Sequence, residues 1–208
     1  STVFAKNVLG DTMLTPALCD FELALYDIDK DRLEESYAMV CALNKNINEG
    51  RATVSKYLGV ENRRDALRGA DFVVNAIQVG GYEPCTVIDF EIPKKYGIRQ
   101  TIGDTLGIGG IFRALRTIPV LEDFAEDMAA VCPKAYFLNY TNPMAMLSGY
   151  MQRYTGIKTV GLCHSVQVCS SGLLRELGIE AKLPLKEKIA GINHMAWLLE
   201  LEDADGND

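Results

Sequence analysis

The chain has 208 residues, of which 48% are hydrophobic and 24% are charged, and 28 acidic against 21 basic side chains give a formal net charge of −7. This is the composition of a globular chain with a core, so it excludes an intrinsically disordered segment. The acidic balance, without a Lys/Arg-rich stripe, excludes a nucleic-acid or anionic-membrane surface and leaves a small neutral or cationic molecule as the expected partner.

Neither a membrane span nor a secretion signal is predicted. No run of about 18 apolar residues occurs, and the N-terminus lacks a basic segment followed by an apolar one. Six cysteines are scattered without a CxxC pair, which is typical of reduced intracellular thiols rather than of a disulfide framework or a zinc ribbon. The cytoplasm is therefore the expected compartment.

Apolar runs of strand length alternate with stretches of helical periodicity along the chain. This alternation predicts βα units around a mostly parallel, doubly wound sheet, which is an α/β fold. In chain order, the pattern predicts a helix that starts at once, a strand over 21–28, a helix over 30–46, a strand over 52–58, a short helix over 62–69 and a strand over 71–77. It then predicts a helix over 111–131, a strand over 135–140, a helix over 144–154, a strand over 159–163, a helix to about 177 and strand-like segments over 186–194 and 197–201.

Both ends of the sequence look cut. The first helix begins without the strand that should precede it, and residues 203–208 form a turn with no strand after it. We therefore expect the chain to be the ordered part of something larger.

Candidate sites are the polar loops after residues 27, 77, 140 and 163, because ligands of open parallel sheets bind at the carboxyl ends of strands. Asp27 ends a strand about where a dinucleotide-binding fold places the carboxylate that binds the adenine ribose. An acid at this place is as often a solvated turn residue, and Asp29 is a weaker candidate for the same role. Ser1 could be the last residue of a Gly-rich turn, with the free N–H groups of the helix behind it available to a pyrophosphate.

Cys163 and His194 are candidate metal ligands, because a thiolate and an imidazole are good donors and both residues fall at the mouths of predicted strands. A lone cysteine and a lone histidine are more often packed and hydrogen-bonded. The polar, turn-like surroundings of both residues reduce the odds of that simpler explanation.

Asn139 and Asn142 present two amides at a strand exit, which suits sugar hydroxyls, but the residues alone favour an Asx turn or a helix cap. Pro143 keeps Asn142 out of the helical region. The glycine-rich segment 101–110 is either a ligand loop or a connection that needs positive φ.

Taken together, six strings resemble glycoside hydrolase family 4, most closely its melibiase-type α-galactosidases. They occur in the family's order and span nearly the whole chain: STVFAKN (1–7), QVGGYEPC (78–85), GIFRALRTIP (110–119), NYTNPM (139–144), GLCHSVQ (161–167) and AGINHMA (190–196). Each string alone would be weak, whereas the ordered set is specific.

The resemblance implies a glycosidase that needs NAD and a divalent metal, typically Mn²⁺, and that does not use the usual pair of carboxylates. In the implied reaction, NAD takes a hydride from C3 of the sugar, and the metal acts as a Lewis acid while the C2 proton is removed. The aglycone is then eliminated, water adds to the unsaturated ketone, and the hydride returns to C3. The implied substrate is a terminal α-galactoside. Ligand type alone would favour zinc or iron, because a thiolate is a soft ligand.

The resemblance also assigns residues. Cys163 and His194 match the metal ligands, Asn142 matches a substrate-binding asparagine with Asn139 nearby, and His164 would assist the leaving group because imidazole can donate a proton near neutral pH. The nucleotide-site matches are Ser1, Asp27, Asn75 and the loop Val79-Gly80-Gly81. Phosphosugar members carry an arginine near the position of Cys85 and Thr86, so its absence here implies an unphosphorylated sugar.

The implied organisation is a Rossmann-like NAD-binding domain over 1–163 and the beginning of an α+β substrate- and metal-binding domain over 164–208. The family's first strand and its fingerprint glycines would precede Ser1, and its tyrosine base would follow Asp208. A homo-oligomer, dimer or tetramer, is implied. The alternatives are an α-glucosidase or α-galacturonidase of the same family, a lactate/malate-type dehydrogenase with Arg113 and Arg116 as substrate clamps, and an inactive dinucleotide-binding module.

Overall fold

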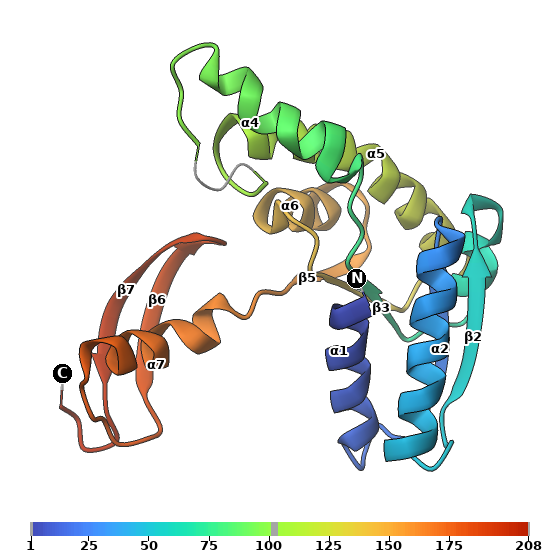
Figure 1. Ribbon diagram of the computed structural model, residues 1–208, viewed down its shortest axis with the longest axis horizontal. Coiled ribbons are helices and arrows are strands. Elements are labelled where there is room, and N and C mark those ends of the chain that lie inside the picture. Colours follow the sequence, from blue (N-terminus) through green and yellow to red (C-terminus); the bar gives the residue numbers. More distant parts are fainter. Residues whose placement is uncertain (1, 101–103, 208) are drawn as a thin grey trace. The chain divides into compact units, whose positions relative to one another are not determined.

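The computed structural model describes residues 2–100 and 104–207 (Figure 1). The chain divides into two compact units, one formed by Ser1–Val73 with Asp123–Ala135 and the other by Val74–Glu122 with Tyr136–Asp208. The expected boundary between 163 and 164 concerns the binding roles of two domains, and it stays a prediction.

The first unit is a βα arrangement around a parallel pair of strands. Its elements are α1 (Thr2–Leu14), β1 (Glu22–Asp27), α2 (Lys30–Ile47), β2 (Thr53–Leu58), the 3-10 turn η1 (Val60–Asn62) and α3 (Arg63–Leu67). β1 and β2 pair in parallel with Asp27 opposite Leu58, and α1 runs beside α2 (Figure 1). α2 begins where the Asp29 side chain accepts a hydrogen bond from the amide of Arg32, which satisfies one of the free N–H groups of its first turn.

The core of the first unit combines helix and strand residues that the sequence pattern made apolar. Leu33 and Val40 lie one above the other on α2 and are 3% and 0% exposed. Phe124, Ala125, Met128 and Cys132, from the end of α5 (Gly107–Val131) and the residue after it, are also buried. The edge of the Tyr26 ring packs on Phe124, with the ring centroids 5.8 Å apart.

A buried ion cluster joins α3 to the end of α5. Arg63, which is 7% exposed, donates to Asp127 at 2.6 Å and stacks over the ring of Phe124 at 4.9 Å. Arg64 donates to the other carboxylate oxygen of Asp127. A buried arginine of this kind is tolerated only while its partner charge is present.

The second unit is built on a three-stranded sheet in the order β3-β4-β5, with β4 and β5 parallel. Its elements are the end of β3 (Phe72–Asn75), the turn η2 (Gly81–Thr86), α4 (Val87–Lys94), the first part of α5, β4 (Tyr136–Asn139), α6 (Met144–Tyr154), β5 (Lys158–Gly161), α7 (Ser165–Leu177), β6 (Lys186–Ile192) and β7 (Met195–Glu202). α6 packs on β5, and β6 and β7 form the long antiparallel hairpin of Figure 1.

The α/β class with parallel strand pairs is confirmed, and most elements lie within a few residues of their predicted bounds. Two details differ. α4 was not predicted, and α5 begins at Gly107 rather than near residue 111. The glycines of residues 107–110 did not indicate a helix in the sequence. A glycine is nevertheless needed at position 110, because a Cβ there would lie 2.8 Å from the carbonyl carbon of Thr105.

Two expectations fall partly on undescribed residues. Ser1 and residues 101–103 lie outside the part of the chain that the structure describes. In the described part, no helix combines the length and the apolar character needed to cross a membrane.

Candidate active site

The carboxyl ends of β3 and β4 carry a buried network of amides and hydroxyls. The Asn75 amide donates to Asn139 Oδ1 at 2.8 Å and to Thr141 Oγ1 at 3.1 Å. The Asn139 amide donates in turn to the Thr141 carbonyl at 3.2 Å and to Ser148 Oγ at 3.1 Å. Since Asn139 is 0% exposed and its amide is fully engaged, it shapes the loop that follows β4.

That loop presents Asn142, which is half-buried and joined to Pro143 by a cis peptide. Its carbonyl accepts a hydrogen bond from Arg113 Nε at 3.2 Å. Within residues 2–100 and 104–207, its side-chain amide has no hydrogen-bond partner. Asn142 is therefore the member of the predicted asparagine pair whose amide can serve a ligand.

Cys163 lies between the end of β5 and the first turn of α7. Its Sγ is 3.1 Å from Ser165 Oγ and accepts from the Ser165 amide at 3.4 Å. Partial burial raises the pKa of the Cys163 thiol, but hydrogen bonds with Ser165, the Asn193 side chain and the His164 amide outweigh it and hold the pKa below the usual value. Such an environment favours the thiolate, which is the form that binds metals.

His194 occupies the turn between β6 and β7 with a φ of 64°, and its Nε2 lies 3.6 Å from Cys163 Sγ. In tetrahedral zinc sites, metal bonds of about 2.3 Å to sulfur and about 2.0 Å to nitrogen place the two ligand atoms about 3.5 Å apart. The predicted pair, 31 residues apart in sequence, is therefore brought together at a separation that fits two ligands of the same metal ion.

Two protein ligands are fewer than a closed structural site uses. Among the described residues, no three His, Cys, Asp or Glu side chains group around a possible ion. An ion held by Cys163 and His194 would keep coordination positions for other molecules, as catalytic metal sites do. The donor set therefore fits a catalytic ion better than a structural one.

His164 follows directly on Cys163 and precedes α7, where its side chain is exposed. The structure places it beside one candidate metal ligand in the chain. Its role as a proton donor stays a prediction.

The Val79-Gly80 turn is held by Arg116, which the sequence suggested only as a substrate clamp of a dehydrogenase, and by Asp89, which was not assigned to any site. Gly80 has a φ of 90°, and a Cβ on it would lie 2.6 Å from Cys85 Sγ. Arg116 donates to the Val79 carbonyl at 3.3 Å, and its guanidinium pairs with Asp89, which is 2% exposed. Arg116 and Asp89 thus fix the shape of this turn, and the apolar pattern of α4 and α5 gave no signal of it.

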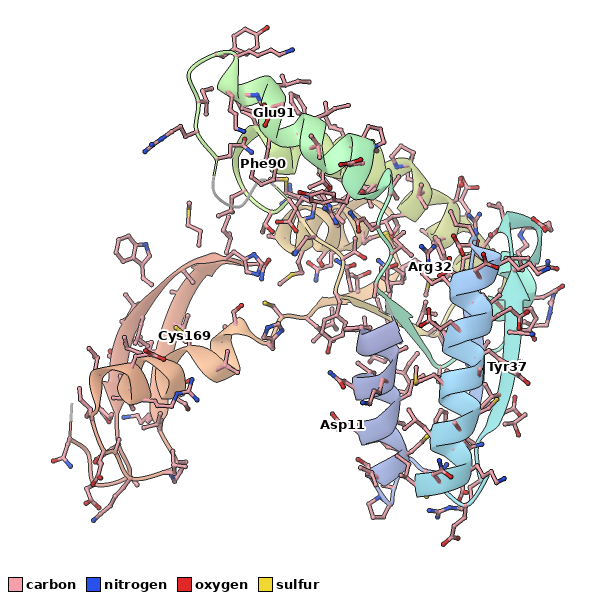
Figure 2. All side chains as sticks on the ribbon, in the orientation of Figure 1. Asp11, Arg32, Tyr37, Phe90, Glu91 and Cys169 are labelled. Atoms are coloured by element: carbon pink, nitrogen blue, oxygen red, sulfur yellow. The ribbon has the colours of Figure 1, made fainter. Side chains whose placement is uncertain are left out.

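Asp27 belongs to the first unit, where it ends β1. Its carboxylate is paired with Arg32, a residue of α2 that Figure 2 labels, and accepts from the Asp29 amide at 3.0 Å. Burial raises the pKa of Asp27, but the hydrogen bonds from Arg32 and the Asp29 amide lower it further, so the group stays ionised. An ionised carboxylate at a strand end is the group that a ribose-binding role requires.

In α/β folds with parallel strands, ligands bind at the carboxyl ends of the strands, where this chain carries its amides and Cys163. The model of the family described as "Family 4 glycosyl hydrolase" matches residues 1–179. The chain belongs to this family.

Curated relatives agree with this assignment, and a solved structure shares the fold. An alpha-galactosidase of Bacillus subtilis is 62% identical over 208 residues, which is 100% of this chain and 47% of that protein. An alpha-galacturonidase of Thermoanaerobacter italicus is 37% identical over 94% of this chain and 42% of its own length. The crystal structure of a 6-phospho-alpha-glucosidase from gut microorganisms, in complex with NAD and Mn²⁺, matches all of this chain and 46% of its own with a TM-score of 0.83 at 21% identity. The chain thus spans about half the length of the curated relatives it matches.

Proposed function

We propose that this chain carries the NAD and metal site of a glycosidase that cleaves terminal α-galactosides, such as melibiose. The observation that carries the proposal is the 3.6 Å approach of Cys163 Sγ and His194 Nε2 within a family 4 chain. The much higher identity to an alpha-galactosidase, 62%, than to an alpha-galacturonidase, 37%, supports the galactoside. An α-galacturonidase and an α-glucosidase are the alternatives within the family.

The geometry of the second unit supports the proposed metal- and substrate-binding roles. Cys163 and His194 would hold the ion, for which we propose Mn²⁺ or another divalent metal. When bound, NAD would accept and return a hydride at C3 of the sugar, and the ion would polarise the neighbouring oxygens so that the C2 proton becomes acidic. The Asn142 amide would bind sugar hydroxyls, and Asn139 would hold the Asn142 loop in place. No arginine lies near Cys85 and Thr86 in the sequence, which supports an unphosphorylated sugar.

The nucleotide-binding roles are proposals for each residue separately. Asp27 would accept hydrogen bonds from the adenine ribose hydroxyls, since its carboxylate is ionised and lies at the end of β1. Asn75 and the Val79-Gly80 turn would contact the cofactor at the end of β3. Ser1, which lies outside the described residues, keeps its proposed place at the pyrophosphate.

The dehydrogenase alternative needs arginines that are free to clamp a carboxylate. Arg113 is buried and donates to the Asn142 carbonyl, whereas Arg116 pairs with Asp89. Both guanidinium groups therefore hold loops in this chain, and the glycosidase is the better supported function.

Hydrolysis of nitrophenyl α-galactoside by the full-length protein tests the proposal, with NAD and Mn²⁺ added or omitted and a reductant present. We expect turnover to need both, and we expect the C2-deuterated substrate to react more slowly because a C–H bond breaks at that carbon. Turnover without NAD would contradict the proposed chemistry. Net reduction of NAD would indicate the dehydrogenase, and activity on a galacturonide or glucoside alone would transfer the proposal to that sugar.

Replacing His164 with alanine should lower the rate of melibiose hydrolysis more than the rate of nitrophenyl α-galactoside hydrolysis. A general acid contributes roughly 10²–10⁴-fold where the leaving group must be protonated, and a nitrophenolate leaves without a proton. The measurement is kcat/KM on both substrates. Equal losses on the two would argue against the proton-donor role.

The assembly and compartment are proposals as well. We expect a homodimer or homotetramer in the cytoplasm, where the six cysteines, all free in this structure, would remain reduced. Light scattering on the purified protein would measure the oligomer.

A further inference from the structure

The second ring nitrogen of His194 contacts a residue outside the proposed metal and substrate ligands. Nδ1 lies 3.2 Å from Thr105 Oγ1, across 89 residues of sequence. Thr105 stands just before α5 and is 3% exposed. The hydroxyl of Thr105 also donates to Asp104 Oδ1 at 3.1 Å.

These two contacts determine the proton position on the ring. A hydroxyl has one proton to donate. Because the Thr105 proton goes to Asp104, its oxygen is left to accept the proton of Nδ1. The ring then carries its proton on Nδ1, and the lone pair of Nε2 faces Cys163 Sγ, where a metal ion would bind.

We propose that Thr105 is the positioning residue of the metal site, holding His194 in the tautomer and orientation that ligation requires. The inference rests on the proposed metal role of Cys163 and His194. Ligating histidines commonly donate their other N–H to a neighbouring acceptor, which fixes the tautomer and makes the ligating nitrogen more basic. Here that acceptor is a buried hydroxyl that passes the interaction on to a carboxylate.

Close contacts hold the backbone that follows Thr105. A Cβ on Gly110 would lie 2.8 Å from the carbonyl carbon of Thr105, so a glycine is needed for this close packing. The Gly109 amide also donates a hydrogen bond to Gln100 Oε1 at 2.8 Å. Such close packing leaves little freedom to a neighbouring side chain. The packing of Thr105 against the start of α5 does not depend on its contact with His194.

The same segment also reaches the substrate-side loop. Asp104 approaches Arg113 at 4.0 Å, and Arg113 Nε donates to the Asn142 carbonyl at 3.2 Å. Residues 104–113 thus support both the proposed metal ligand and the proposed sugar-binding asparagine. A displaced Thr105 would loosen the metal ligand first, because its contact with His194 is direct.

The test compares Thr105→Val, which keeps the shape and removes the hydroxyl, with Thr105→Ser, which keeps the hydroxyl. Thr117→Val is the matched control, since Thr117 is a buried threonine of α5 whose hydroxyl donates only to the Arg113 carbonyl of the same helix. Two readouts are needed in the full-length protein. One is the Kd for Mn²⁺ by titration, and the other is the His194 tautomer from ¹⁵N shifts in the metal-free protein at a pH where histidine is neutral.

We expect Thr105→Val to weaken Mn²⁺ binding about tenfold or more and to move the metal-free ring towards the Nε2–H tautomer. Thr105→Ser and Thr117→Val should match the wild type in both. An unchanged Kd together with an unchanged tautomer in Thr105→Val would overturn the inference.

The two proposals can fail separately. If Cys163→Ser binds Mn²⁺ as tightly as the wild type, the metal site itself is wrong, and with it the proposed function. If only the Cys163 variant loses Mn²⁺ while Thr105→Val behaves as the wild type, the metal site stands and Thr105 is merely structural.

Discussion

Replacing Cys163 with serine is expected to abolish metal-dependent hydrolysis while the fold is retained. Serine is nearly isosteric with cysteine, but its hydroxyl is not ionised near neutral pH and is a poor replacement for a thiolate ligand. A Lewis acid supplies several kcal/mol of transition-state stabilisation, so we expect kcat/KM on nitrophenyl α-galactoside to fall by about 10³-fold. Bound Mn²⁺ should fall in parallel.

The matched control is Cys169→Ser. Cys169 lies on α7 (Figure 2), and Cys163 lies just before the start of this helix. The side chain of Cys169 is exposed. This variant should keep its activity and its Mn²⁺ affinity. Full activity in Cys163→Ser would refute the metal assignment, whereas equal losses in both variants would indicate a general sensitivity of α7.

Replacing Asp127 with asparagine is expected to destabilise the first unit strongly. The variant keeps the shape of the side chain and removes the charge that Arg63 and Arg64 share. Arg63 is buried and would keep the ring of Phe124 and, as a partner charge, the 3.6 Å approach of the exposed Asp123. Breaking a buried pair costs about 3–5 kcal/mol, and urea unfolding of the purified protein measures the loss.

The pH dependence of this loss has a definite sign. Burial raises the pKa of Asp127, but the hydrogen bonds from Arg64 and Arg63 lower it further, so the native pKa lies below the unfolded value of about 3.9. The stabilisation is therefore fully present above about pH 4 and disappears as the pH falls through the native pKa. The difference between wild type and Asp127→Asn should shrink over that range.

Asp65→Asn is the control for the charge change. Asp65 pairs with Arg68 on the surface, where both side chains are more than half exposed, so its loss should cost well under about 1 kcal/mol. A cost in Asp127→Asn no larger than this would mean that Arg63 is solvated in solution.

Local patterns in the sequence determined most elements. α6 has its predicted bounds, Met144–Tyr154, and α2 differs by one residue, because helical periodicity, a capping Asp29 and a preceding proline are all local signals. The same holds for the strands and for the α/β class. α4 was missed, since the turn η2 and Pro93 interrupt its pattern.

The sequence by itself determined the order of elements, the strand ends where polar side chains gather, and, through six ordered strings, the family. Only the tertiary structure decided which of those side chains meet. It brings Cys163 to His194 across 31 residues and Thr105 to His194 across 89, and it commits Asn139 and Arg116 to internal contacts. The physical reason is that contacts between distant residues depend on how strands and loops pack, which no local periodicity encodes.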